Sequence, residues 1–162
     1  MTSAPSVRWT PQAHLHLTLK FLGEQPVGTA DAVVAAIDSV ASRHAPFRLD
    51  VSGLGAFPNR GRPRVVWAGV AAEPRVELLY HDVEIACAAL GLPLEGRAFR
   101  PHVTLGRADR LATDELGALD AAARAARVAV ASHISSVDLM RSELTARGAR
   151  HERVAAAVLG GA

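Results

Sequence analysis

Two short segments of this sequence, 86 residues apart, carry the same pair of reactive side chains. The first reads His16-Leu17-Thr18-Leu19 and the second reads His102-Val103-Thr104-Leu105. Chance alone gives less than one His-any-Thr triplet in a chain with seven histidines and seven threonines. Successive side chains of a β-strand point to opposite faces, so each histidine shares a face with its threonine. The two segments therefore predict a site built from two strands.

These residue types suit acid–base chemistry at a phosphate group. Imidazole exchanges its proton near neutral pH, so two histidines that face one site can act as general base and general acid. A threonine hydroxyl beside each histidine can donate a hydrogen bond to a phosphate oxygen. The pattern indicates hydrolysis of a cyclic phosphodiester, in which one histidine deprotonates water and the other protonates the leaving ribose oxygen. This chemistry needs no metal ion and no other cofactor.

A zinc site is the alternative interpretation of the same histidines. His14 has the same strand parity as His16, so His14, His16 and His102 together resemble the ligand set of three-histidine hydrolases. The two threonines have no role in such a site, and we therefore favour acid–base catalysis. His14 is then expected at the surface or behind the catalytic pair.

The composition indicates a globular protein. The 162 residues are 49% hydrophobic, enough for a packed core, and they suit a single domain over 1–162. No apolar run approaches the roughly 18 residues that a membrane helix needs, and the N-terminus does not resemble a signal peptide. We expect a cytoplasmic monomer that does not bind membranes. Cys87 is the single cysteine, and we expect it to be a small buried residue.

Arginine supplies 17 of the 18 basic residues, and Lys20 is the other one. Arginine binds phosphate through a rigid fork, so this bias agrees with a phosphate-bearing partner. A GC-rich genome produces the same bias together with alanine-rich stretches such as LDAAARAARVAVA. We favour the genomic explanation and infer no partner from the arginine content.

Hydrophobic periodicity predicts the elements that must position the two segments. Alternation predicts strands at 14–23, 47–57, 64–70 and 99–107, and two more within 128–144 and 151–159. Helical spacing predicts helices over 29–44, 74–90 and 113–127. The second helix has Pro74 in its first turn and Gly91 after its end. Strands and helices do not alternate strictly, so we expect an α+β fold with antiparallel or mixed sheets.

Four segments resemble successive signature segments of the 2H phosphoesterases, namely RWTPQAHLHLTLKFLGE, GLGAFPNRGRPRVVWAGV, FRPHVTLGR and MRSELTARGARHE. They are most similar to the RNA 2′,3′-cyclic phosphodiesterase branch, whose members are also called 2′-5′ RNA ligases. The resemblance implies a bilobal fold with helices packed outside its sheets, one motif per lobe and a pseudo-two-fold central cleft. It also implies a hydrolase that opens 2′,3′-cyclic phosphates at RNA ends, such as those of tRNA fragments, to 2′-phosphates, with 2′-5′ RNA ligation as the reverse activity.

The resemblance implies a role for each motif residue. By position, His16 resembles the proton donor and His102 the proton acceptor, while Thr18 and Thr104 resemble the residues that hold the phosphate. Arg107 resembles the basic residue that follows the second motif.

Two features of this sequence differ from that pattern. Arg107 has the opposite strand parity to His102, so it reaches the site only if the chain bends, and Gly106 is the candidate position for the bend. The family also usually begins with a strand and a helix before its RW segment, which are not found here. Either the start of the sequence has been assigned late, or the protein lacks an element that flanks the cleft, which would bear on stability and substrate binding.

The motifs contact the phosphate rather than the base, so two other functions stay open. One is the same chemistry on a small cyclic nucleotide, such as an ADP-ribose cyclic phosphate. The other is a non-catalytic module that binds RNA without turnover.

Five further residues could have a structural role or a functional one. Lys20 either binds RNA phosphate or is solvated at the strand end. Phe57 either stacks on a base or fills the core, and we favour the core. We expect Trp9 and Trp67 in the core and His151 at the surface.

Overall fold

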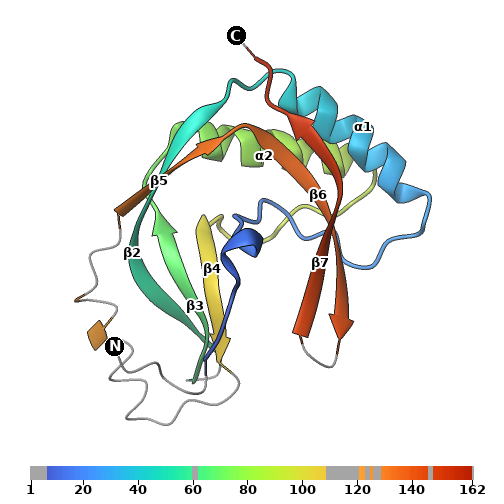
Figure 1. The fold of residues 1–162 in the computed structure, drawn as a ribbon. Coiled ribbons are helices and arrows are strands. Elements are labelled where there is room, and N and C mark those ends of the chain that lie inside the picture. The colour runs from blue at the N-terminus through green and yellow to red at the C-terminus, as the bar shows by residue number, and fades with distance from the viewer. Residues whose placement is uncertain are drawn as a thin grey trace. The chain divides into compact units, whose positions relative to one another are not determined.

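The described residues fold into an α+β structure of antiparallel strands with the two α-helices α1 and α2. The computed structural model describes residues 7–59, 62–108, 121–122, 125, 129–145 and 148–161. The elements follow in the order β1 (Val7–Trp9), the 3-10 helix η1 (Gln12–His14), α1 (Thr29–Ala41), β2 (Phe47–Asn59), β3 (Arg62–Val70), α2 (Pro74–Ala89), β4 (His102–Ala108), β5 (Ala129–Ile134), β6 (Ser136–Thr145) and β7 (Gly148–Val158) (Figure 1). The predicted fold class is confirmed.

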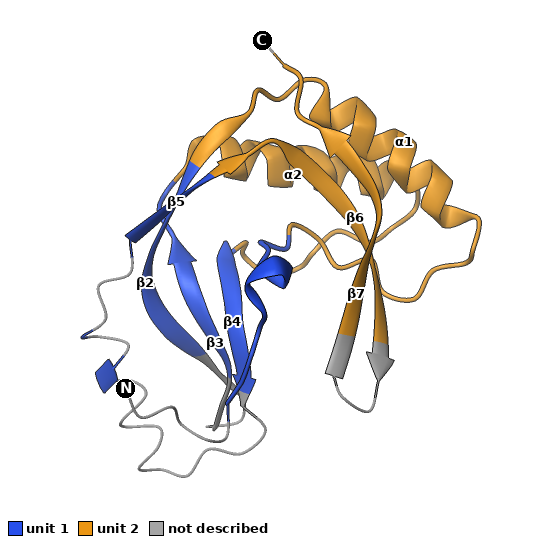
Figure 2. Ribbon diagram, viewed as in Figure 1, with its two compact units in different colours: residues 1–18, 49–72, 100–132 blue, residues 19–48, 73–99, 133–162 orange. Residues whose placement is uncertain are grey.

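The strands of the described residues form two sheets. A five-stranded sheet has the order β1-β4-β3-β2-β5, and β6 pairs with β7 in a separate antiparallel ribbon. Contacts divide the chain into unit 1 (residues 1–18, 49–72 and 100–132) and unit 2 (residues 19–48, 73–99 and 133–162), as Figure 2 shows. Both His-any-Thr segments belong to unit 1, whereas the family resemblance implied one motif per lobe. The physical reason is a backbone bridge that joins the two segments directly.

Unit 2 is held together by the packing of its two helices. Helix α1 packs against α2 and against both strands of the β6–β7 ribbon. Its apolar stripe follows the helical spacing expected from the sequence, and so does that of α2. The buried side chains of the two helices are Val33, Ile37, Val40, Ala41, Val76, Leu79, Val83 and Cys87. Burial raises the pKa of the Cys87 thiol, which agrees with its expected role as a small apolar residue.

Helix α2 begins and ends where the sequence indicated. The Glu73 side chain accepts a hydrogen bond from the backbone N–H of Arg75, and Pro74 occupies the first turn. At the other end, Gly91 adopts a φ of +83°, which favours glycine. The backbone N–H of Leu92 then donates to the carbonyl of Cys87, closing the last turn at 3.1 Å.

Three predicted elements differ from the structure. The strand expected over 14–23 is the end of η1 followed by an extended segment with one bridged residue, Leu17. The stretch 128–144 holds two strands, β5 and β6, because the chain leaves one sheet at Ser135 and enters the other. The helix expected over 113–127 lies almost wholly outside the described residues.

No helix in the described part of the chain is long and apolar enough to cross a bilayer.

Candidate active site

Strand β4 carries the second motif between two neighbouring segments. On one side it pairs with β3, where His102 lies opposite Gly69 and Thr104 lies opposite Trp67. On the other side it pairs first with β1 and then with the first motif. The N-terminal segment follows this edge of β4 and leaves it only for the 3-10 turn at Gln12–His14. Strand β4 is therefore the element that brings the two motifs together.

A bridge between Leu17 and Val103 aligns the motifs with each other. The pair is antiparallel, so continuing its register places His16 opposite Thr104 and Thr18 opposite His102. These four side chains then share the face opposite to that of Leu17 and Val103. Each histidine faces a threonine across the strands. The two histidines occupy diagonal positions, typically about 7–8 Å apart, which leaves room for a phosphate group between them.

Both histidines are held in the same way by the backbone. Nδ1 of His16 lies 2.7 Å from the carbonyl oxygen of His14, and Nδ1 of His102 lies 2.7 Å from the carbonyl oxygen of Arg100. A carbonyl oxygen only accepts hydrogen bonds, so each Nδ1 must carry the proton and donate. In the neutral form of each ring, Nε2 is therefore the nitrogen without a proton. Identical tautomers at paired positions suit an acid–base pair.

A β-bulge in β4 decides the position of Arg107. The pairing with β3 advances from Trp67–Thr104 directly to Val66–Gly106, so Leu105 is the extra residue. Beyond the bulge, Arg107 pairs with Val65, which has the same parity as Trp67. Arg107 therefore returns to the face of Thr104 and His102, although a regular strand would point it away. The sequence indicated that Arg107 could reach the site only if the chain bent near Gly106, and the bulge at Leu105 provides this bend.

Trp67 is a site residue that the sequence did not reveal. It is half-buried rather than in the core, and its ring makes an edge-to-face contact with His102 at a centroid distance of 6.4 Å and an interplanar angle of 62°. The indole lies over Gly55, its partner on β2. A Cβ on Gly55 would lie 2.7 Å from Cε2 of Trp67 and closer still to two other ring atoms. The missing side chain at Gly55 is thus what lets the indole lie beside His102.

We predict that Gly55→Ala lowers turnover in a protein that still folds. The methyl group must displace the Trp67 ring and with it the support of His102. Overpacking of this kind costs about 1–3 kcal/mol of unfolding free energy, and a displaced catalytic group costs up to about a hundredfold in rate. Turnover of a cyclic-phosphate substrate and a urea melt measure the two effects. Gly96→Ala is the matched control, because nothing lies within 4 Å of a Cβ at that position; equal activity of the two variants would contradict the prediction.

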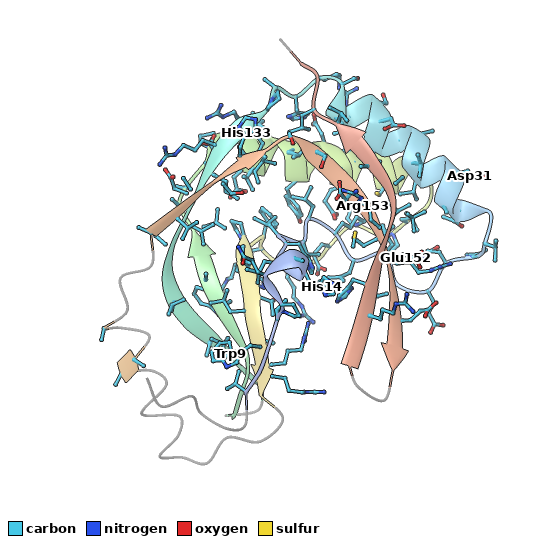
Figure 3. All side chains as sticks on the ribbon, viewed as in Figure 1. Trp9, His14, Asp31, His133, Glu152 and Arg153 are labelled. Carbon is cyan, nitrogen blue, oxygen red and sulfur yellow. The ribbon has the colours of Figure 1, made fainter. Side chains whose placement is uncertain are left out.

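The described residues do not form the cluster that the three-histidine zinc site would require. His14 ends η1 instead of continuing a strand, so it loses the parity that placed it beside His16. Its backbone carbonyl oxygen contacts Nδ1 of the His16 ring. Within the described ranges, no three His, Cys, Asp or Glu side chains group as ligands for a metal ion. Figure 3 labels His14 at the end of this turn and Trp9 on β1.

Lys20 is buried in an ion pair rather than solvated at a strand end. Its Nζ lies 2.7 Å from Oε1 of Glu84 on α2, and both side chains are about 95% buried. It also donates to the carbonyl of Pro93 at 2.8 Å, while Oε2 of Glu84 accepts from the backbone N–H of Glu95. Lys20 therefore ties the segment after the first motif to α2.

The remaining sequence predictions have mixed outcomes. Trp9 is 51% exposed rather than in the core. Its ring lies across Gly106, its partner on β4. His151 lies on β7 and its Nδ1 shares a 2.8 Å hydrogen bond with the hydroxyl of Ser142. Phe57 belongs to β2, and its side chain lies outside the described residues.

Comparison with known proteins identifies the family. The model of the LigT-like phosphoesterases matches residues 2–67 and 70–150. The chain belongs to the LigT-like phosphoesterase family. The described strands and both motifs fall within the matched ranges, apart from residues 68–69 of β3 and the end of β7.

Relatives and solved structures of the LigT-like phosphoesterases are similar to this chain. An RNA 2′,3′-cyclic phosphodiesterase of Methanothermobacter thermautotrophicus is 32% identical over 149 residues, which are 88% of this chain and 77% of that protein. One of Geobacillus stearothermophilus is 41% identical over 106 residues, 65% of this chain and 34% of the relative. A crystal structure from Thermus thermophilus aligns with a TM-score of 0.79 and 30% identity, covering 98% of this chain and 85% of that one. Some curated relatives are much longer, since the chain spans 34% of one and 61% of another.

Proposed function

We propose that this LigT-like phosphoesterase hydrolyses 2′,3′-cyclic phosphates at RNA ends and leaves a 2′-phosphate. The observation that carries the proposal is the antiparallel bridge at Leu17 and Val103, which sets two histidines and two threonines on one face. The names of the relatives supply the substrate class, because the four-residue geometry fits any cyclic phosphodiester.

The reaction is an in-line displacement at phosphorus. Nε2 of His102 takes a proton from water as the water oxygen forms its bond to phosphorus. The bond from phosphorus to the ribose 3′-oxygen breaks, and Nε2 of His16 delivers a proton to that oxygen. The products are a 2′-phosphate and a 3′-hydroxyl, and the two histidines exchange protonation states in the process.

The other residues hold the phosphate while charge develops on its oxygens. The hydroxyls of Thr18 and Thr104 donate to the non-bridging oxygens from the two sides of the histidine pair. Arg107, which the bulge returns to this face, supplies a fixed positive charge and a two-pronged donor. The backbone pairing that carries these residues is present without substrate, which supports a site that needs little reorganisation during the reaction.

The test is phosphate-end analysis of a short RNA with a 2′,3′-cyclic phosphate, incubated with the protein in EDTA. We expect a 2′-phosphate and a free 3′-hydroxyl. A 3′-phosphate product would reverse the roles of the two ribose oxygens and contradict the mechanism. Activity that disappears in EDTA and returns with zinc would contradict metal-independent catalysis. RNA that binds but is not cleaved would favour the non-catalytic module.

A further inference from the structure

Each motif histidine contacts the carbonyl oxygen of the residue two positions before it, so one residue lies between the carbonyl and the ring. In the first motif this intervening residue is Leu15, and in the second it is Pro101. The two contacts have the same length, 2.7 Å from Nδ1 to the oxygen. The proposed mechanism uses both histidines and gives neither intervening residue a role. Equal spacing and equal length indicate that both intervening residues meet the same geometric requirement.

The first motif shows which backbone angle this contact uses. Leu15 has a φ of −68° and a ψ of 127°, close to the polyproline II conformation. This φ matches the value of about −65° that a proline ring imposes. At Leu15 the 3-10 turn supports the angle, because the N–H of Leu15 donates to the carbonyl of Gln12 at 3.1 Å. The first motif therefore reaches a proline-like φ with the help of a hydrogen bond.

Pro101 supplies the same angle through its ring. Proline locks its own φ near about −65°, and its ring also restricts the preceding residue, Arg100, to extended backbone. After Pro101 the chain is fixed by the sheet, since His102 begins β4 and pairs with Gly69. The described pairs of β4 with β3 begin at His102, so the missing N–H of Pro101 interrupts none of them. The carbonyl of Arg100 thus keeps its direction toward Nδ1 of His102.

The direction of this carbonyl decides which neutral form of His102 is present. A carbonyl oxygen only accepts, so a ring that faces it carries the proton on Nδ1 and leaves a lone pair on Nε2. A ring that turned away from the carbonyl would be able to carry the proton on Nε2 instead. That nitrogen would then be unable to take a proton from water. A general base at His102 therefore requires the form that the carbonyl of Arg100 selects.

We propose that Pro101 is a positioning residue for proton transfer at His102. Its ring fixes the carbonyl of Arg100 as the acceptor for Nδ1, and Nε2 of His102 stays able to accept a proton. The inference rests on the proposed function and adds to it a residue that acts only through His102. The two histidines are then oriented by different means, one by a proline ring and the other by a 3-10 turn.

The first measurement is the tautomer of His102, read by NMR from the chemical shifts of the two imidazole nitrogens. At about pH 8.5 an ordinary imidazole is neutral, so the shifts report the tautomer directly. In the wild type we expect the proton on Nδ1 of both motif histidines, with signals assigned from the spectra of His16→Ala and His102→Ala. In Pro101→Ala the φ at this position is no longer locked. The two nitrogen shifts of His102 should therefore move toward each other, while those of His16 stay in place.

Turnover gives the second readout. Pro101→Ala should lower kcat for a cyclic-phosphate RNA end by about tenfold, since a small misplacement of a reacting group costs up to about a hundredfold. KM should change little, because the residues proposed to hold the phosphate are kept. Pro26→Ala is the matched control, at an exposed proline of unit 2 whose carbonyl accepts from the N–H of Thr29, a bond that alanine keeps. Both variants gain freedom in the unfolded chain and should share a small drop in Tm, but only Pro101→Ala should change kcat.

The outcomes separate this proposal from the proposed function. A wild-type His102 with its proton on Nε2, or an unchanged tautomer in Pro101→Ala, would overturn the proposal whatever the rates. A changed tautomer with wild-type kcat would overturn the role in proton transfer. An equal fall of kcat in Pro26→Ala would trace the loss to stability and overturn that role as well. If the wild type hydrolyses no cyclic phosphate, the proposed function fails, while the spectra still decide whether Pro101 sets the tautomer of His102.

Discussion

His102→Ala and His16→Ala should each lower turnover of a cyclic-phosphate RNA end by about 10²–10⁴-fold while the protein stays folded. Each variant removes one partner of the acid–base pair and leaves the threonines, Arg107 and the backbone pairing in place. His16 is exposed and His102 half-buried, so neither truncation opens a cavity in the buried core. Single-turnover rates and urea melts measure the two quantities. Near-normal activity in either variant would contradict paired-histidine catalysis.

The pH–rate profiles of these variants should separate the two roles. The pH–rate profile of the wild type should be bell-shaped, because one histidine must be neutral and the other charged. A general base loses activity as pH falls and it becomes protonated, so His102→Ala should lose the acidic limb of the bell. A general acid loses activity as pH rises, so His16→Ala should lose the alkaline limb. If His102→Ala lost the alkaline limb and His16→Ala the acidic limb, His102 would be the proton donor and His16 the proton acceptor.

His14→Ala is the matched control for both variants. It removes a neighbouring imidazole but keeps the backbone carbonyl that orients His16. We expect activity close to that of the wild type. Two results together would instead support the three-histidine metal site. His14→Ala would lose as much activity as His16→Ala, and zinc would restore the activity of the wild type after chelation.

Lys20→Ala should lower the free energy of unfolding by about 3–5 kcal/mol, the usual cost of removing one partner of a buried ion pair. The variant leaves the Glu84 carboxylate almost fully buried without its cation and removes the bond to the carbonyl of Pro93. Urea unfolding measures the change. Arg141→Ala is the comparison, because Arg141 and Glu152 are also 2.7 Å apart but both are more than half exposed. That variant should change the unfolding free energy little.

A double variant tests the cause of this loss. Lys20→Met with Glu84→Gln leaves no buried charge, and the amide oxygen can still accept from the N–H of Glu95. It should recover much of the stability lost by Lys20→Ala. If Lys20 acted on RNA instead, Lys20→Ala would keep its stability and weaken the salt dependence of substrate binding. That result would contradict a structural role for the pair.

The sequence determined those features that depend on local pattern. The repeated His-any-Thr spacing predicted which side chains share a face, and the register of Leu17 with Val103 agrees with this. The helical spacing, Pro74 and Gly91 predicted α2 and its ends, because caps and stripes act within a few residues. The signature segments also predicted the phosphoesterase family, which the comparison with known proteins confirms.

Only the tertiary structure decided features that depend on contacts between distant segments. In a regular strand, Arg107 would point to the face opposite His102 and Thr104. The bulge at Leu105, which arises in the pairing of β4 with β3, puts Arg107 on the same face as these residues. Lys20 continued a polar strand face in the sequence, but an acid 64 residues away on α2 withdrew it from solvent. Trp67 lies beside His102 because Gly55, on another strand, leaves space for its ring. In each case the position of the side chain depends on a partner that is distant in the sequence. The local sequence does not encode where that partner lies.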